Sequence, residues 1–370
     1  MLPYFSERFG NPSSRQHSFG QEAARAVAEG RARVAALVGA QPEEIVFTSG
    51  ATESDNLALR GAARALSSRG RHVVTTAIEH PAVLEPCRTL EREGFAVTRV
   101  EVDASGVVEP ARIVAALRPD TVLVSVMAAN NEIGTIQPVA AVGAACRERG
   151  VVFHCDAVQA LGRVPVDVVA WQADLVSLSA HKMYGPKGVG ALFVRRNRTP
   201  RLRLQAQAEG GGQEKGLRSG TLNVPGIVGF GEASRLAAVA LASGEPQRLR
   251  ALRDRLLAGL RERIEGVELN GAAEPRLPGN LHVSIARVEA ETLILSLGGR
   301  IALSSGAACA EEGGKGSHVL RAIGLADERV YTALRFGLGR YNDAGEVDAV
   351  VDALAEAVKA ARERTRPASP

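Results

Sequence analysis

The sequence predicts an α/β protein: a mostly parallel sheet with helices on both faces, followed by a smaller α+β domain. Two observations support this prediction. Short β-branched runs alternate with amphipathic segments over residues 43–195, a rhythm typical of parallel sheets covered by helices. From Pro225 the composition changes to a long helical stretch rich in Ala, Leu and Arg. We therefore expect a large domain over residues 1–225, a connecting helix over 226–264 and a small C-terminal domain over 265–370.

Seven runs of the large domain have the length and the β-branched content of strands. They are residues 43–49, 71–77, 95–102, 121–127, 151–157, 173–180 and 190–195. The amphipathic segments between them, such as 55–70 and 140–150, are expected to be helices. In the small domain, 280–286 and 300–306 are expected to be strands, and 346–365 is expected to be a C-terminal helix.

The composition favours a soluble protein of a reducing compartment. Lys and Arg total 45 against 41 Asp and Glu, and the net charge of +4 is spread along the chain, so we expect no nucleic-acid or membrane surface. The first residues lack the pattern of a signal or transit peptide, and apolar runs such as TVLVSVMAA are too short to span a bilayer. The four cysteines show neither close pairing nor zinc-site spacing, which favours a cytoplasmic protein without a structural metal.

Polar side chains gather just after the predicted strands, where open α/β sheets bind their ligands. The segment TSGATESDN, residues 48–56, lies between a strand and a helix, and its small residues would let the backbone approach a phosphate at the helix N-terminus. The same letters also fit an ordinary Ser/Thr helix cap. His80 follows the next strand, and by itself it is equally well explained as a surface histidine.

An acid and a lysine follow two successive strands later in the chain. Asp156, with Gln159 close behind it, ends one strand, and Lys182 follows the next strand in a glycine-rich loop that also holds Lys187. Asp156 is either a helix cap or the counter-ion of a protonated ring nitrogen. An arginine cannot replace a lysine whose amine must lose its proton and attack a carbonyl. A lysine amine, an acid, a flat group and a phosphate cup are the parts that pyridoxal phosphate requires, and their order here predicts that cofactor.

Nine segments carry a resemblance to a known family, in order from about residue 10 to residue 340. They are GNPSSRQHSFG, EEIVFTSGATESDNLA, EHPAVL, NNEIGTIQP, HCDAVQALGRVPVD, SAHKMYGPKGVGAL, RSGTLNVPGIVG, SSGAAC and LRFGLGR. The chain resembles the cysteine desulfurases, which supply sulfur for iron–sulfur clusters. This resemblance implies a fold-type-I enzyme that uses pyridoxal 5'-phosphate, converts L-cysteine to L-alanine and passes the sulfur through an enzyme persulfide. It also implies a cytoplasmic homodimer with shared active sites, and an iron–sulfur scaffold or another sulfur-acceptor protein as its partner.

The resemblance assigns roles residue by residue. Lys182 would bind the cofactor covalently and move protons, Asp156 would pair with the ring nitrogen, and His80 would stack on the ring. Asn131 and Arg335 would bind the substrate, with Arg335 as a planar fork for the substrate carboxylate. The other cofactor contacts that the resemblance implies are Ala51, Thr52, Asn131, Gln159, Ser179 and His181, together with Thr221 from the second subunit.

Cys309 is the residue that sets the reaction. It lies in SSGAACAEEGGKGSHVL, whose glycines predict a pliable loop after a strand-like run. A thiol on such a loop can take sulfur from the substrate and carry it away. By contrast, Cys87, Cys146 and Cys155 are expected to be buried packing residues.

The chain departs from the family pattern in two places. A strand and loop reading like YLDYNATTP normally precede the first matching segment, and their absence leads us to expect either an upstream start or an impaired form. Gln213 and Glu209 stand in the glycine-rich region where the family usually carries a histidine. Two alternatives stay open from the sequence. One is another fold-type-I enzyme, a selenocysteine lyase or an aminotransferase, which would not need Cys309; the other is a catalytically impaired sulfur-relay or assembly partner.

Overall fold

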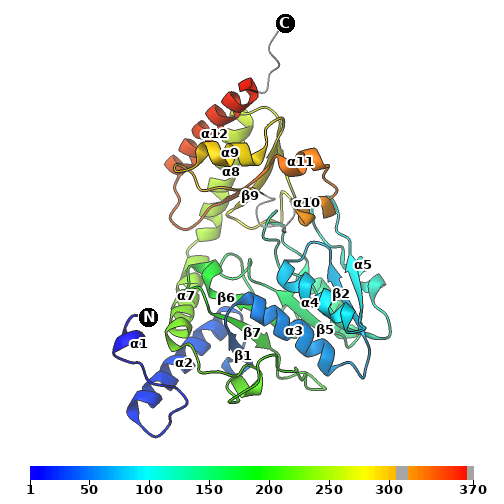
Figure 1. The fold of residues 1–370 in the computed structure, drawn as a ribbon, viewed down its shortest axis with the longest axis vertical. Helices are drawn as coiled ribbons and strands as arrows, with labels where there is room; N and C mark the ends of the chain where they lie inside the picture. Colours follow the sequence, from blue (N-terminus) through cyan, green and yellow to red (C-terminus); the bar gives the residue numbers. More distant parts are fainter. Residues whose placement is uncertain (306–315, 365–370) are drawn as a thin grey trace. The chain divides into compact units, whose positions relative to one another are not determined.

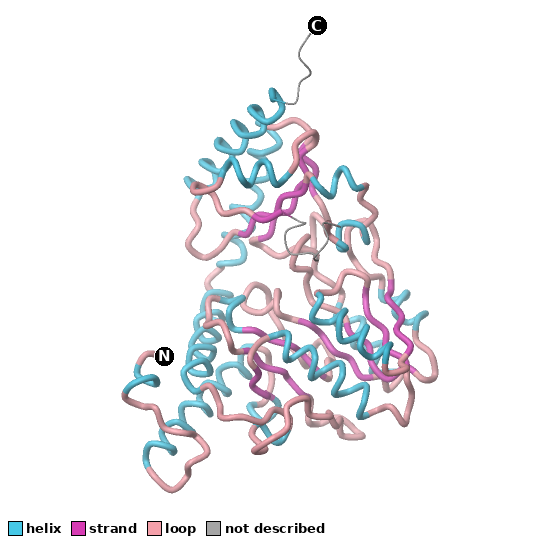
Figure 2. The backbone as a smooth tube through the Cα atoms, viewed as in Figure 1, coloured by secondary structure: helices cyan, strands magenta, loops and turns pink. Residues whose placement is uncertain are grey.

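The computed structural model describes residues 1–305 and 316–364, which fold as two compact units (Figures 1 and 2). The first unit comprises Met1–Val100, Val108–Ala129 and Gln137–Ser243. The second unit comprises Glu101–Val107, Asn130–Ile136 and the described residues from Gly244 onward. The units therefore divide the chain at other positions than the expected domains, and two short segments from the first half of the chain belong to the second unit.

A seven-stranded sheet forms the centre of the first unit, in the order β1-β7-β6-β5-β4-β2-β3. The strands are β1 (Ile45–Thr48), β2 (His72–Thr76), β3 (Ala96–Val100), β4 (Thr121–Ser125), β5 (Val152–Asp156), β6 (Leu175–Ser179) and β7 (Gly190–Val194). Each lies within one of the seven predicted runs, so those strand predictions are confirmed. Neighbours from β3 to β6 pair in parallel, and β7 is antiparallel to both β6 and β1, which confirms the predicted mostly parallel sheet.

Helices cover both faces of this sheet. The helices of the first unit are α1 (Pro3–Ser6), α2 (Ser18–Leu37), α3 (Ala51–Ala65), α4 (Pro81–Arg92), α5 (Pro110–Ala116), α6 (Val139–Glu148) and α7 (Val224–Ala242), with short 3-10 helices η1 (Pro42–Glu44), η2 (Ala180–Met183) and η3 (Glu214–Gly216). Adjacent side chains of a strand point to opposite faces. His154 of β5 faces Asp55 of α3, whereas Phe153 lies against Gly143 of α6. Figure 1 shows α3 and α4 lying across the strands on one of these faces.

Helix α7 is the one helix of the described residues that is long and apolar enough, by length and composition, to cross a membrane. Half of its most apolar window is buried within the protein. It packs along α2, and the two backbones approach closely at Gly30 and Gly231. Glu232 and Arg235 interrupt its apolar sequence, so it contains no long uninterrupted apolar run.

The predicted connecting helix over 226–264 is wrong in detail, because the chain forms two helices there. Helix α7 ends at Ala242, and Gly244 adopts a left-handed conformation with φ of 85° before α8 (Glu245–Arg263) begins. A left-handed residue cannot continue a right-handed helix, and proline is favoured in a first turn, where Pro246 stands.

A four-stranded antiparallel sheet forms the centre of the second unit, in the order β10-β11-β9-β8. Its strands are β8 (Val267–Leu269), β9 (Asn280–Ile285), β10 (Ser304–Ser305) and β11 (Ala333–Gly337). Besides α8, its helices are α9 (Ala290–Leu297), α10 (His318–Ala322), α11 (Asp327–Tyr331) and α12 (Ala344–Arg364). The strand over 280–286 and the C-terminal helix are confirmed, whereas the described part of 300–306 contains only the two residues of β10.

Candidate functional site

The carboxyl ends of β1, β2, β5 and β6 lie at the same end of the seven-stranded sheet. The register shows this, because Thr48 of β1 pairs with Gly190 of β7, and Gly190 also pairs with Ser179 of β6. The segments that follow these four strands carry most of the predicted site residues, namely Ala51, Thr52, His80, Asp156, Gln159, Ser179, His181 and Lys182. The structure thus brings together residues that are far apart in the sequence.

Asp156 is the last residue of β5, and its side chain is only 6% exposed. Burial raises its pKa from the usual value of an aspartate to about 6, while the N–H of Val158 and the charge of Lys182 oppose that rise. The Val158 N–H donates to Oδ1 over 2.9 Å. Asp156 is therefore a buried carboxylate that a cation would stabilise.

Lys182 lies in η2, immediately after β6, and is half-buried. Its charge acts on Asp156, so the amine and the carboxylate share one environment. Behind it the chain turns sharply, with Tyr184 in the left-handed region at φ of 67° and no room at Gly185 for a side chain beside Ala180. Lys187, on the far side of that turn, is exposed. The structure therefore separates two lysines that the sequence places in one loop.

The N-terminus of α3 presents backbone N–H groups without a side-chain cap. Gly50 is the capping residue and makes no side-chain hydrogen bond, so the Ser/Thr cap considered from the sequence does not form. Thr52 is exposed in the first turn. At the end of β6, the hydroxyl of Ser179 lies 2.9 Å from Nδ1 of His181. A helix end of this kind attracts an anion.

Two further predicted residues of the first unit make local contacts, and a third is exposed. Nδ1 of His80 accepts a hydrogen bond from the N–H of Ala82 over 3.1 Å and so caps α4. Oε1 of Gln159 accepts from Arg163 over 2.9 Å. Thr221 is exposed in the segment just before α7. These observations neither support nor contradict the roles that the family resemblance implies for the three residues.

The second unit holds the two predicted substrate residues. Arg335 lies in the middle of β11, and its Nη1 donates to the carbonyl oxygen of Asn131 over 3.0 Å. Both residues are half-buried. The contact fixes one side of the guanidinium group. Cys309 lies outside the described residues.

Comparison with known proteins assigns the chain to a family. The family described as aminotransferase class-V matches residues 1–350. The chain belongs to the class-V aminotransferases. Its curated relatives include "Cysteine desulfurase IscS" of Anaeromyxobacter dehalogenans (strain 2CP-C), which is 52% identical over 363 residues, covering 98% of this chain and 89% of the relative.

Solved structures of this family have the same fold. A NifS-like protein matches with a TM-score of 0.89 and 38% identity, over 97% of this chain and 94% of that chain. The apo structure of a cysteine desulfurase from Thermococcus onnurineus NA1 matches with a TM-score of 0.86 and 25% identity, over 97% and 90%. The predicted fold-type-I architecture and the predicted family resemblance are confirmed.

Three buried titratable side chains near Asp156 were missed by the sequence analysis. They are Asp55 of α3, Glu79 after β2 and His154 of β5. The only signal was the presence of polar letters inside buried apolar segments, as in VVFHCDA. Among residues 1–305 and 316–364, no group of three or more His, Cys, Asp or Glu side chains is placed to hold a metal ion.

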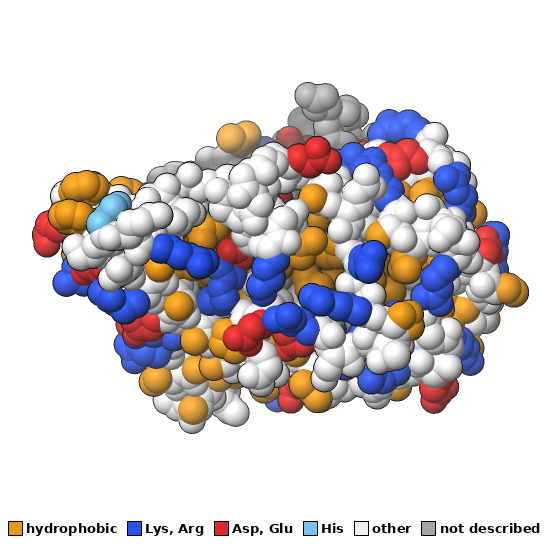
Figure 3. All heavy atoms as spheres, turned by 90° about the horizontal axis from the view of Figure 1, so that it is seen from below, with side chains coloured by type: hydrophobic (Ala, Val, Ile, Leu, Met, Phe, Trp, Pro, Cys, Tyr) orange, Lys and Arg blue, Asp and Glu red, His pale blue; other side chains and the backbone are white. Residues whose placement is uncertain are grey.

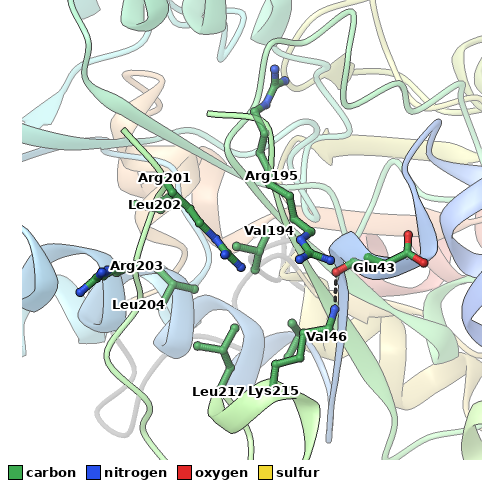
Figure 4. Close-up of a pocket in the computed structure, with 11 residues that line it drawn as sticks. Glu43, Val46, Val194, Arg195, Arg201, Leu202, Arg203, Leu204, Lys215 and Leu217 are labelled. Atoms are coloured by element: carbon green, nitrogen blue, oxygen red, sulfur yellow. Dashed lines mark hydrogen bonds between the residues drawn. The ribbon is translucent and has the colours of Figure 1, made fainter. Parts of the chain in front are cut away.

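A separate hollow of the first unit, about 360 Å³ in volume, contains none of the predicted site residues (Figure 4). Basic and apolar side chains both line it, and Lys215 among them donates to the carbonyl oxygen of Glu43. Its lining includes Arg195, Arg196, Arg201, Arg203, Val46, Val194, Leu202, Leu204 and Leu217. On the face drawn in Figure 3, basic and acidic side chains are both spread among apolar ones.

Proposed function

We propose that this class-V aminotransferase is a pyridoxal-phosphate-dependent cysteine desulfurase that acts on L-cysteine in the cytoplasm. The observation that carries the proposal is that Lys182 and buried Asp156 lie at the ends of adjacent strands, where the charge of Lys182 acts on the carboxyl group. Relatives named cysteine desulfurase, similar over nearly the whole chain, support the choice of reaction within the family.

The described residues fit pyridoxal phosphate at three points. Asp156 is buried at the end of β5, and its carboxylate would hold a protonated ring nitrogen. The uncapped N-terminus of α3, with Thr52, Ser179 and His181 nearby in the fold, would hold the phosphate. Lys182 supplies an amine for a covalent bond to the cofactor aldehyde. When bound, the cofactor draws electrons from the α-carbon of the substrate.

The protein's own groups would then position the substrate and move its protons. Lys182 removes a proton from the α-carbon and returns one later. Its charge acts on Asp156, so its amine would lie beside the cofactor ring that Asp156 holds. Arg335 binds the substrate carboxylate, with its guanidinium held by the carbonyl of Asn131. His80 lies against the ring, and Gln159 and Asn131 contact the cofactor, as the family resemblance implies.

The transferred sulfur ends on Cys309. The thiolate attacks the sulfur of the substrate, an S–S bond forms as the C–S bond breaks, and the electron pair left on carbon is protonated to give alanine. Cys309 then carries a persulfide, which an iron–sulfur scaffold or another acceptor protein receives. We also propose a homodimer in which Thr221 of each subunit completes the phosphate site of the other.

The decisive experiment supplies the purified chain with pyridoxal phosphate, L-cysteine and a thiol reductant. We expect alanine and sulfide in equal amounts. L-selenocysteine, and L-alanine with a 2-oxo acid, serve as competing substrates in the same assay. Amino transfer without sulfide, or turnover of selenocysteine alone, would contradict the proposal and favour one of the other fold-type-I activities.

Cofactor affinity should fall as the pH drops below about 6. The pKa of Asp156 is raised to about 6 by burial, so the carboxylate is ionised above that pH and protonated below it. Only the ionised form holds a protonated ring, so affinity should fall roughly tenfold for each pH unit below the pKa. Equilibrium titration of the cofactor-free protein with pyridoxal phosphate measures this. The Asp156→Asn variant is the control and should bind weakly without this pH dependence; equal wild-type affinity on both sides of pH 6 would exclude the role of Asp156.

A further inference from the structure

A buried histidine lies beside Asp156 on the face of the sheet that α3 covers. His154 and Asp156 are two residues apart on β5, so their side chains point to the same face. Nδ1 of His154 is 2.8 Å from the hydroxyl of Ser125 on β4, and Nε2 is 3.0 Å from the hydroxyl of Ser177 on β6. The ring is fully buried. Both nitrogens are therefore held, and the ring has one orientation.

Asp55 faces this histidine from α3. Its Oδ1 lies 3.5 Å from Nε2 of His154, and the hydroxyl of Ser177, which is 3.0 Å from that nitrogen, acts on the same carboxyl group and lowers its pKa. Asp55 is fully buried, and burial raises its pKa well above the usual value, with further increases from Asp156 and Glu79. Asp55 lies one turn after Ala51, so α3 carries both the N-terminus that would bind an anion and this buried acid.

Three buried carboxyl groups thus share one small region of the first unit. The third is Glu79, which accepts hydrogen bonds from Thr76 over 2.7 Å and from the N–H of Met127 over 2.9 Å. Burial raises its pKa to about 8, and the charge of Asp156 adds to that rise. The thiol of Cys155 is neutral here because burial raises its pKa as well. The cation that acts on Asp156 is Lys182.

The carboxyl groups in this region compete for ionisation, and the charge of Asp156 raises the pKa of both Asp55 and Glu79. Each carboxyl group that ionises nearby pushes a proton onto the others. Asp156 can hold a protonated ring nitrogen only while it is itself ionised. His154 is a base beside Asp55 and changes the ionisation of these groups. A proton shared by Asp55 and His154 cancels the charge of the Asp55 carboxyl group.

We propose that His154 is a positioning residue for Asp156: with Asp55 it forms a buried pair that shares one proton, so the pair carries no net charge and Asp156 stays ionised. The inference rests on the proposed cofactor site, and it assigns a role to two residues that do not touch the cofactor. Burial lowers the pKa of His154 to about 3 and raises that of Asp55, so the proton resides on the carboxyl group and the imidazole is neutral. The pair is then uncharged.

The test uses three variants of the full chain: His154→Gln, Asp55→Asn and the double variant. Glutamine keeps hydrogen bonds to the serine hydroxyls but cannot take up a proton. In His154→Gln, Asp55 has no base to share its proton and ionises more readily, so the acid limb of pyridoxal phosphate binding should move up by about one pH unit, a roughly tenfold loss of affinity below neutral pH. Asp55→Asn removes the competing charge and should show no such loss. The double variant should bind within a few-fold of Asp55→Asn, because without Asp55 the histidine has no charge to cancel.

His72 provides the matched control. It is also buried in the sheet between two hydroxyl groups, with Nδ1 2.7 Å from Thr121 and Nε2 2.9 Å from Thr98, but it stands at the amino end of β2. His72→Gln should leave the pH profile of cofactor binding unchanged. Thermal unfolding of each cofactor-free variant establishes that it is folded. If His154→Gln matches His72→Gln, or if its loss of affinity persists in the double variant, the inference is wrong. Failure of the wild-type chain to bind pyridoxal phosphate would instead overturn the proposed function.

Discussion

Lys182→Ala should abolish the covalent attachment of pyridoxal phosphate and reduce alanine formation by about 10²–10⁴-fold or more, the range that loss of a proton-transferring group produces. The proposed phosphate-binding residues of α3 and β6 remain in the variant, so the protein should still bind the cofactor without a covalent bond. Borohydride reduction followed by peptide mass spectrometry measures the attachment, and the rate of alanine release measures turnover.

Lys187→Ala is the matched control for that variant. Lys187 lies in the same loop but is exposed, whereas Lys182 is half-buried and acts electrostatically on Asp156. The control should keep both the adduct and the activity. A reducible adduct on Lys187 in the Lys182→Ala protein would show that the wrong lysine has been assigned.

Cys309→Ala should separate cofactor chemistry from sulfur transfer. The variant should bind pyridoxal phosphate and L-cysteine as the wild type does, because the proposed groups for those steps are elsewhere in the chain. Sulfide release should fall by at least about a hundredfold, since removal of a nucleophile usually costs more than that. Mass spectrometry of the wild-type protein after brief exposure to L-cysteine should find one additional sulfur on Cys309.

The other three cysteines are poor candidates for the same role. Cys87, Cys146 and Cys155 are fully buried, which confirms that they are packing residues. Burial raises the pKa of Cys87 and of Cys146 to about 12, and it raises that of Cys155 as well. A thiol of this kind is not a nucleophile at neutral pH. Cys87→Ala is therefore a suitable control, and full sulfide release from Cys309→Ala would contradict the proposed relay.

Much of the first unit could be predicted from the sequence, because most of its strands are buried on both faces. Such strands are short and almost continuously apolar, as in IVFT of β1 and LVSLS of β6, and turns bound them. The second unit was harder to predict. Strand β8 is only Val267–Leu269 and is not fully buried, and Arg335 interrupts the apolar pattern of β11. The break at Gly244 was missed because a single glycine in an Ala/Leu-rich stretch does not by itself end a helix.

The site residues that stand at the ends of strands could be predicted from the sequence. Those that depend on a contact between the sheet and a helix could not. Asp156 and Lys182 each directly follow an apolar run, so their position on a parallel sheet places them together. The contact between His154 and Asp55 joins a strand to a helix from a distant part of the chain. No spacing rule connects two such residues, and in the sequence each of them reads as an ordinary polar residue.

The buried carboxyl groups also make the stability of the folded chain depend on cofactor binding. Asp55, Glu79 and Asp156 have raised pKa values in the folded protein, about 6 for Asp156 and about 8 for Glu79. These groups therefore lower its stability progressively as the pH rises from about 4, where the unfolded groups ionise, through the folded pKa values. At neutral pH the cofactor-free chain already carries much of this cost. A ligand that binds only the native state restores stability in proportion to its free concentration. Newly made chains that have not yet bound pyridoxal phosphate should therefore unfold more often and be degraded sooner, so the abundance of the protein should follow the supply of vitamin B6.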